Sequence, residues 1–191
     1  MNNFQKVRAW AEARNLIKGA TPISQFAKLI SEHGELAGHV QEMADLPKAL
    51  KDVSTEDFNE AIQKLVDSMI DDVGDSLVVL TIIGAQLGID IETILPDSVV
   101  KGTEMLQLSQ AHGLLADAIL KNDMEAFNGI VSTLFALYGV VSVDLGVTLD
   151  DALATAYEDI KDRKGVMYNG TFVKDSDARY ASILEELGLS E

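Results

Sequence analysis

The sequence predicts an all-α helical bundle, and three observations carry this prediction. Apolar residues recur at helical spacing along almost the whole chain of 191 residues. Only three prolines occur, and Pro22, Pro47 and Pro96 all lie between segments with that spacing. Hydrophobic residues make up 47% of the chain, enough for a sizeable core. We therefore expect one helical domain over residues 1–175, followed by a C-terminal helix or tail over residues 176–191.

Seven helical segments are expected, and residues with capping chemistry stand at their ends. Thr21 precedes the second segment, and the hydroxyl of either Ser54 or Thr55 can cap the third by accepting a backbone hydrogen bond. Gly88, Gly146 and Gly165 follow the third, fifth and sixth segments, as glycines often do at helix ends. The expected helices span residues 3–17, 24–44, 55–87, 99–120, 124–145, 149–163 and 176–187.

One stretch, residues 164–173, does not read as helix. Its centre is Asn169-Gly170, a pair that favours tight turns, and apolar residues flank the pair on both sides. This pattern predicts a loop or a small hairpin.

Composition argues against several classes of function. A net charge of −16, from 15 basic and 31 acidic residues, disfavours binding to nucleic acids or anionic membranes. The chain has no cysteine, which excludes disulfides, thiolate nucleophiles and zinc–thiolate sites. The first residues lack the apolar core of a signal peptide, and the longest apolar stretch, about residues 77–89, is shorter than the roughly 20 residues of a membrane span. We expect a cytoplasmic protein without a membrane or nucleic-acid partner.

Two pairs of carboxylates are the strongest functional signal. Glu32 and Glu35 are three residues apart, as are Asp72 and Asp75, so each pair lies on one face of its helix. Two such helices packed antiparallel can bring four carboxylates together, and a hard divalent cation such as Mg²⁺ offsets their repulsion. The pattern suggests a metal site that handles phosphates.

Other acids at the same spacing read differently. Three further pairs lie in polar surroundings and are interpreted as solvated helix faces, whereas Asp72 and Asp75 lie in an otherwise apolar helix, where burial of a carboxylate is costly. Asp71 is interpreted either as a support for the metal ligands or as an exposed acid. The three further pairs are Glu42/Asp45, Asp57/Glu60 and Asp159/Asp162.

An internal repeat is visible in two places. Residues 29–38 resemble residues 108–117, and residues 87–95 resemble residues 145–153. The second copy keeps the apolar frame and loses the acids, because Ala111, Leu114, Ile130 and Thr133 stand where the first copy has Glu32, Glu35, Asp72 and Asp75. We expect a catalytic half over about residues 4–97 and a degenerate half over about residues 99–164. A chance match of amphipathic helices is the alternative.

Together these motifs resemble the all-α nucleoside triphosphate pyrophosphohydrolases, the MazG-like group that includes dimeric dUTPases and phosphoribosyl-ATP pyrophosphatases. The family pattern of two acid pairs on successive helices is matched by SEHGE at residues 31–35 and DVGD at residues 72–75. The end of the last long helix, residues 156–165, and the Asn169-Gly170-x-Phe172 segment, typical of phage-type members, also look like the family. The resemblance covers most of residues 7–174.

The resemblance implies an activity and a ligand set. A metal-activated water would attack between the α and β phosphates of a nucleoside or deoxynucleoside triphosphate, giving a monophosphate and pyrophosphate. Glu32, Glu35, Asp72 and Asp75 would bind Mg²⁺, or Mn²⁺ in its place, and the protein would be a homo-oligomer, a dimer in the simplest case. Two departures are that Ser31 replaces a leading glutamate and that Asp72 is shorter than the family's glutamate.

Substrate contacts are expected from a few further side chains, each with a simpler alternative. Lys161, Arg163 and Lys164 bind phosphates or complement a helix dipole, and Lys28 reaches a phosphate or pairs with Glu32. Trp10 stacks on a base or packs in the core.

Three readings of function stay open. The first is a pyrophosphohydrolase, the second a catalytically lapsed member that binds nucleotide or protein, and the third a purely structural helical protein. The third explains poorly why Asp72 and Asp75 lie in an apolar helix. His33, His39 and His112 are too few and scattered for a transition-metal site, and the matching repeat positions of His33 and His112 favour packing.

Overall fold

The computed structural model describes residues 1–50, 53–94 and 104–189. It is an all-α protein with one small two-stranded sheet, so the expected fold class is confirmed. In chain order the described elements are α1 (Asn3–Ala13), α2 (Leu16–Gly19), α3 (Pro22–Ala49), α4 (Thr55–Gln86), the 3-10 helix η1 (Ile91–Thr93), α5 (Glu104–Lys121), α6 (Met124–Asp144), α7 (Leu149–Ile160), β1 (Gly165–Tyr168), β2 (Thr171–Lys174) and α8 (Tyr180–Leu187).

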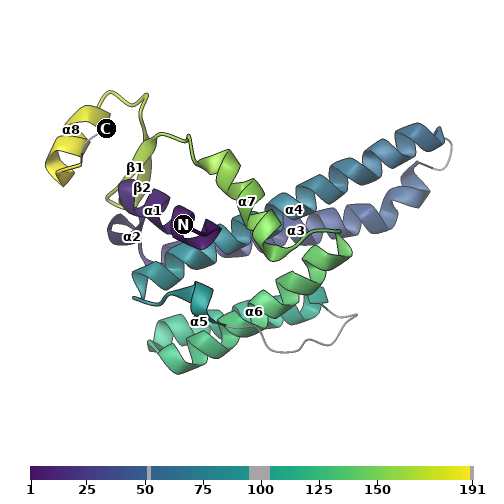
Figure 1. Cartoon of the computed structure of the whole chain (residues 1–191), viewed down its shortest axis with the longest axis horizontal. Helices are drawn as coiled ribbons and strands as arrows, with labels where there is room; N and C mark the ends of the chain where they lie inside the picture. Colours follow the sequence, from purple (N-terminus) through teal and green to yellow (C-terminus); the bar gives the residue numbers. More distant parts are fainter. Residues whose placement is uncertain (51–52, 95–103, 190–191) are drawn as a thin grey trace.

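Two antiparallel helical hairpins form the centre of the molecule (Figure 1). In the first, α3 packs along α4, and in the second, α5 packs along α6. α3 also contacts α5, which joins the two hairpins, and α7 packs against α4. The C-terminal end of α3 and the N-terminal end of α4 project beyond the other elements (Figure 1), and we call these two ends the arm. The acid pairs expected on α3 and α4 therefore lie on neighbouring helices.

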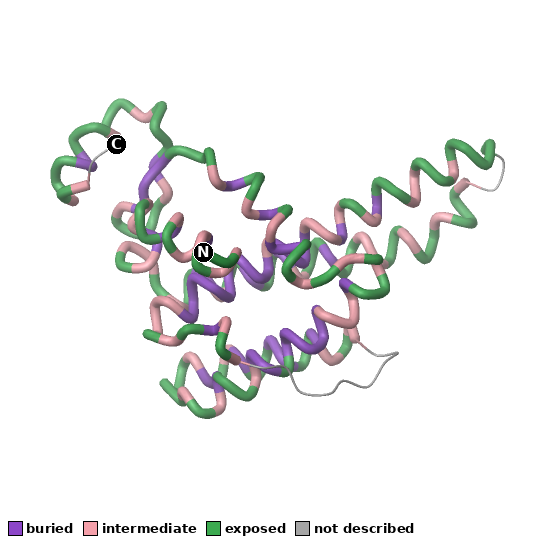
Figure 2. Tube along the Cα trace, viewed as in Figure 1, coloured by how far each residue is buried: buried purple, intermediate pink, exposed green. Residues whose placement is uncertain are grey.

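The core lies along the C-terminal half of α4 and along α6 (Figure 2). Every residue of α4 from 76 to 84 is buried. Among the described helices, α6 is long and apolar enough to cross a membrane, and 44% of that stretch is buried inside the protein. A helix that is apolar all round is also what a soluble core contains, so this property of α6 does not indicate a membrane.

The expectation that all three prolines lie between helices is wrong for Pro47. α3 does not end at residue 44 but continues through Pro47 to Ala49. Proline removes one helical hydrogen bond, and here the loss falls in the last turn of a helix on the exposed arm, where water can reach the freed carbonyl. Pro22 opens α3, where its missing N–H costs little, and Pro96 lies outside the described residues.

The first expected helix, residues 3–17, is broken at its C-terminal end. Asn15 adopts a left-handed conformation with φ of 54°, which asparagine tolerates better than most residues. The break is held by long-range pairing, because the backbone N–H of Met167 donates to Arg14 O at 2.8 Å and Asn15 Nδ2 donates to Met167 O at 2.9 Å. A local pattern carries no sign of this partner 152 residues away.

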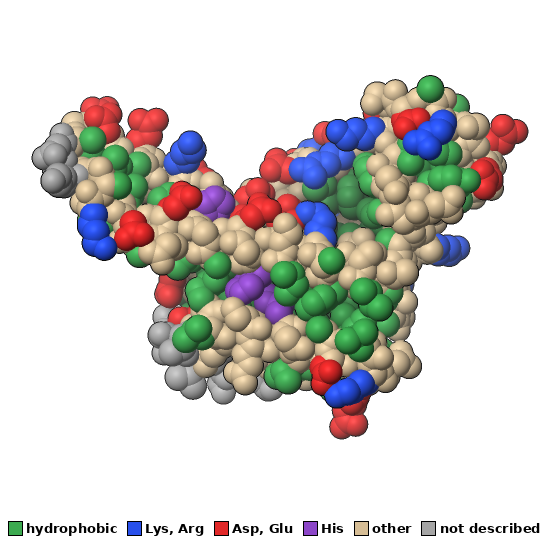
Figure 3. All heavy atoms as spheres, turned by 180° about the vertical axis from the view of Figure 1, so that it is seen from behind, with side chains coloured by type: hydrophobic (Ala, Val, Ile, Leu, Met, Phe, Trp, Pro, Cys, Tyr) green, Lys and Arg blue, Asp and Glu red, His purple; other side chains and the backbone are tan. Residues whose placement is uncertain are grey.

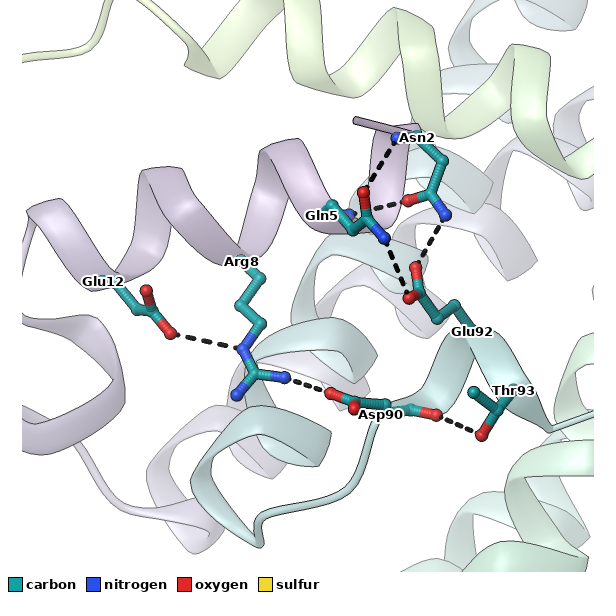
Figure 4. A network of polar contacts seen from close by, with 7 residues as sticks. All are labelled: Asn2, Gln5, Arg8, Glu12, Asp90, Glu92 and Thr93. Atoms are coloured by element: carbon teal, nitrogen blue, oxygen red, sulfur yellow. Dashed lines mark hydrogen bonds and ion pairs between the residues drawn. The ribbon is translucent and has the colours of Figure 1, made fainter.

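A network of polar contacts ties the start of α1 to η1 (Figure 4). Asn2 Nδ2 and Gln5 Nε2 donate to the two carboxylate oxygens of Glu92 at 2.7 and 3.2 Å, and Arg8 forms an ion pair with Asp90. Because η1 follows α4 closely, these contacts fix α1 alongside the C-terminal half of α4. Trp10, on the same helix, is positioned by this attachment.

The stretch around Asn169-Gly170 forms the expected hairpin. β1 and β2 pair antiparallel with Tyr168 opposite Thr171, and Asn169 and Gly170 have φ values of 49° and 76°, as a two-residue primed turn requires. Gly165 was expected to end a helix, but this is wrong. It opens β1, because α7 already ends at Ile160.

The two regions of sequence similarity after α4 and after α6 adopt the same helix ending. Ile89 N–H donates to Gly84 O at 2.8 Å, and Val147 N–H donates to Ser142 O at 3.0 Å. Gly88 and Gly146 stand between these partners with φ of 73° and 84°, which completes a glycine C-cap at both places. The two regions are therefore similar in local structure as well as in sequence. A repeat of the complete halves stays a prediction.

The other helix boundaries differ from expectation by a few residues. The last helix begins at Tyr180 rather than residue 176, and the first five residues of the expected helix 99–120 lie outside the described part of the chain.

Candidate functional site

The candidate site begins with three carboxylates on α4. Asp72 is buried, with 5% exposed, and Asp71 and Asp75 are half-buried. They lie where the residues of α4 change from mostly exposed to continuously buried. Asp71 and Asp75 are four residues apart and share one side of α4, whereas Asp72 lies about a quarter-turn from Asp71.

α3 supplies the other two predicted acids in different environments. Glu32 is buried, with 3% exposed, and it forms an ion pair with Lys28 one turn before it. Glu35 is exposed, and the hydroxyl of Ser31 donates to its Oε1 at 3.4 Å. Of the two alternatives for Lys28, the ion pair with Glu32 is present.

Asp72 meets a histidine across the α3–α4 hairpin. His39 Nδ1 lies 2.6 Å from Asp72 Oδ2. Burial raises the pKa of Asp72, and the hydrogen bond and charge of His39 act in the opposite direction. Spacing along the chain gave no signal for this contact, because the two residues are 33 apart and belong to separate helices.

The pKa of Asp75 shows how closely the acids are gathered. Its pKa is raised from 3.8 to about 6, first by burial and then by the charges of Glu32 and Asp71, against the lowering effect of Lys28 and Arg163. The pKa of Asp71 is also raised, first by burial and then by the charge of Asp159 on α7. We call Glu32, Glu35, Asp71, Asp72 and Asp75 the carboxylate cluster.

Asp71 is the member of this cluster that the sequence left undecided. It is half-buried rather than exposed, and the charges of Glu32 and Glu35 both act on it. The sequence signal that could have placed Asp71 in the cluster is its position one helical turn before Asp75.

The cluster suits a hard divalent cation by its chemistry. Among the described residues, no three acidic or histidine side chains stand close enough to hold a metal ion as they lie. Carboxylate oxygens are nevertheless the ligands that Mg²⁺ prefers, and the two buried carboxylates are each compensated by one side chain, Lys28 for Glu32 and His39 for Asp72. A divalent cation could take over this compensation if those side chains turned away.

The three basic residues expected at the end of α7, Lys161, Arg163 and Lys164, lie in different environments. Lys161 forms an ion pair with Glu158, and Lys164 is exposed. The end of α7 is instead capped by Arg14, whose Nε donates to Arg163 O at 2.7 Å and whose Nη2 donates to Lys161 O at 3.1 Å. The side chain of Arg163 alone among the three lines the cleft described next.

A cleft of about 250 Å³ lies beside Asp75. Its walls come from α1, α3, α4, the end of α7 and the β-hairpin. Most of its lining is apolar, and the polar exceptions are Gln25, Lys28, Asp75 and Arg163. The cleft therefore adjoins the carboxylate cluster, because Asp75 belongs to both and Lys28 in the lining pairs with Glu32 of the cluster.

Trp10 lines this cleft from α1. The guanidinium of Arg14 lies over its ring, 4.8 Å from the ring centre. Its Nε1 is shielded from water, and no described residue accepts the hydrogen bond that it can donate. The side chain is half-buried and packs against the core, so the two expected roles, packing and ligand contact, are compatible here.

His33 and His112 pack against one another where α3 meets α5. Their ring centres are 4.6 Å apart, and His33 Nε2 lies 2.8 Å from Ser109 Oγ. On the face in Figure 3, the histidine patch at the centre borders apolar side chains, and charged side chains gather in the hollow above it. The ring contact between the two helices is in keeping with a packing role.

Comparison with known proteins identifies no family. No family model matches the chain, and no solved structure matches it. A curated relative is an uncharacterized 18.2 kDa protein from the rep-hol intergenic region of Haemophilus phage HP1, 33% identical over 87 residues. This match covers 46% of the chain and 40% of the relative, so the chain spans less than half of that protein's length. The resemblance to MazG-like enzymes accordingly stays a prediction.

Proposed function

We propose that the chain is a cytoplasmic, Mg²⁺-dependent nucleoside triphosphate pyrophosphohydrolase. The observation that carries the proposal is the carboxylate cluster on α3 and α4 beside a mostly apolar cleft with Lys28 and Arg163 in its lining. Such a pairing of acids, cations and an apolar wall suits a ligand that has both phosphates and a flat organic part.

The proposed metal site consists of Glu32, Glu35, Asp72 and Asp75. Bound there, Mg²⁺ would polarise phosphoryl oxygens and offset charge on the pyrophosphate leaving group. Mn²⁺ has the same ligand preference and would serve in its place. Asp71, whose charge acts on Asp75, would add to the local negative potential that attracts a divalent cation.

The side chains of Lys28 and Arg163 would bind the phosphates. Both lie in the cleft lining and close enough to Asp75 to lower its pKa. Lys28 is held by Glu32, and the ion pair would open when a metal takes that carboxylate. Lys161 and Lys164, at the same end of α7, would contribute through longer-range attraction.

The test is pyrophosphate release from a panel of ribo- and deoxyribonucleoside triphosphates, with Mg²⁺ and with a chelator. We expect metal-dependent release, and we expect Glu35→Gln and Asp75→Asn each to lower kcat/KM by at least about 100-fold, because each removes a charged ligand. Glu60→Gln, which changes an exposed acid on the arm of α4, serves as the matched control and should keep full activity.

The alternative is a member that binds nucleotide without hydrolysing it. The observation in its favour is that Glu32 already forms an ion pair with Lys28 and that Asp72 is already hydrogen-bonded to His39. Silence across the panel, together with measurable nucleotide binding by the folded protein, would establish this alternative, and full activity in both ligand variants would refute the assigned ligands.

A further inference from the structure

The cleft beside Asp75 has a size and a lining that limit what it can hold. Its volume of about 250 Å³ is just below the roughly 300 to 1,000 Å³ of sites for drug-sized ligands. One heterocyclic base with part of its sugar fits this scale, and a dinucleotide does not. Phe172 and Met167 of the β-hairpin and Val79 of α4 provide apolar surface for the faces of such a ring.

Two polar side chains in this lining border the space that a ligand would fill. Trp10 Nε1 is shielded from water and has no acceptor among the described residues. Gln25 is buried, with 7% exposed, and belongs to the same lining. Buried polar groups are normally satisfied, so the indole N–H points to a ligand that accepts its hydrogen bond, with Gln25 as a second polar contact.

The chemistry of the two groups defines the ligand edge. An indole N–H only donates, so it needs an acceptor such as a carbonyl oxygen, and a glutamine amide both donates and accepts. A base with a carbonyl oxygen next to a ring N–H satisfies both groups. Uracil, thymine, guanine and hypoxanthine present this edge, whereas adenine has no carbonyl oxygen.

We propose that this cleft is the base-binding subsite and that Gln25 and Trp10 select bases carrying a carbonyl oxygen next to a ring N–H. The proposal rests on the proposed function for the placement of the phosphates at the carboxylate cluster. Lys28 and Arg163 lie in the same lining, where they would neutralise the phosphate next to the sugar.

Binding can be measured without metal and without turnover. Trp10 is the only tryptophan of the chain, so intrinsic fluorescence reports on the cleft directly. In the presence of a chelator, we expect UMP to change this fluorescence saturably and to bind at least about tenfold more tightly than AMP, whose base has no carbonyl oxygen to pair with them. Equal affinity for the two, or no response to either, would overturn the proposal.

Variants assign the selectivity to the named side chains. Gln25→Leu, of similar size, should weaken UMP binding about 3- to 10-fold and leave AMP binding nearly unchanged. Trp10→Phe keeps an aromatic ring without the N–H and should have a similar effect, measured by calorimetry because the fluorophore is lost. Gln41→Leu, an exposed residue on the arm, is the matched control. Circular dichroism shows whether each variant is folded, and the wild-type comparison of UMP with AMP needs no variant.

The two proposals fail in different ways. If UMP binds selectively and no triphosphate is hydrolysed, the base-subsite proposal is supported and the proposed hydrolase activity is refuted. If triphosphates are hydrolysed and both Gln25→Leu and Trp10→Phe leave KM and the preference among bases unchanged, the enzyme stands and the base subsite is refuted.

Discussion

Asp75 belongs to the carboxylate cluster and also lines the cleft, and its raised pKa follows from that position. Burial and the charges of Glu32 and Asp71 raise the pKa from 3.8 to about 6. The folded protein therefore holds a proton on Asp75 more tightly than the unfolded chain does. This contribution to stability is complete below about pH 4 and is lost as the pH rises through about 6.

The first prediction concerns Asp75→Asn in metal-free protein. The amide cannot ionise, so the variant should be more stable than wild type at pH 8 by about 1 to 2 kcal/mol, a figure reduced to allow for partial exposure of the site. At pH 4 the two should be equally stable. Urea unfolding at both pH values in the presence of a chelator measures the difference. A gain of equal size at pH 4 and pH 8 would show that charge is not its cause.

At the scale of elements, the site depends on how closely α7 approaches α4. Gly74 stands between Asp72 and Asp75, and a Cβ built there would lie 2.8 Å from Ala156 Cβ and nearer still to the carbonyl oxygen of Ala152. The missing side chain allows α7 to pack directly on the acid-bearing part of α4. Asp159 and Arg163 approach the carboxylate cluster through this contact.

We expect Gly74→Ala to force the two helices apart. Overpacking of this kind costs about 1 to 3 kcal/mol, which lowers Tm by roughly 3 to 10 °C in a chain of this size. Gly34→Ala on α3 is the matched control, because apart from its chain neighbours and its own helix backbone nothing lies within 4 Å of a Cβ at that position. Alanine should there add about 0.5 to 1 kcal/mol to the free energy of unfolding. Thermal unfolding of both variants provides the measurement. A tolerated Gly74→Ala would mean that the α4–α7 contact can relax.

At the scale of the whole molecule, the two hairpins meet at the histidine pair of α3 and α5. His112 is buried, with 1% exposed, and its Nε2 lies 3.2 Å from the hydroxyl of Tyr138. Burial, and after it the charge of the neighbouring His33, lowers the pKa of His112 to about 4. The unfolded chain therefore binds the proton more readily, and stability falls as the pH drops from about 6.5 to about 4.

His112→Gln should weaken this acid sensitivity, because glutamine can bond to Tyr138 but cannot take up a charge. We expect the loss of stability between pH 6.5 and pH 4 to be about 2 kcal/mol smaller than in wild type. The measurement is the difference between the two unfolding free energies at each pH, which removes the contribution of groups common to both. Parallel pH profiles would contradict a neutral, buried His112.

The homodimer implied by the resemblance also belongs to this scale. Sedimentation equilibrium should give the mass of two 20.7 kDa chains. A monomer at every concentration up to about 100 μM, a range that would exceed the dissociation constant of a stable dimer, would refute it.

Much of the fold could be predicted from the sequence because its signals are local. The helical period, the caps at Thr21 and Ser54 and the Asn169-Gly170 turn all depend on residues within a few positions of one another. The break at Asn15 and the continuation of α3 through Pro47 could not be predicted this way. The first depends on Met167, far along the chain, and the second on solvent around the arm.

The sequence by itself determined that this is an all-α protein and that the acids of α3 and α4 are the candidates for metal chemistry. Spacing on a helix fixes which side chains share a face. Only the tertiary structure decided that His39 holds Asp72, that Asp71 joins the cluster, and that Trp10, Gln25 and Phe172 share one cleft. The physical reason is that burial and electrostatic partners depend on packing between helices, which residue spacing within one helix does not encode.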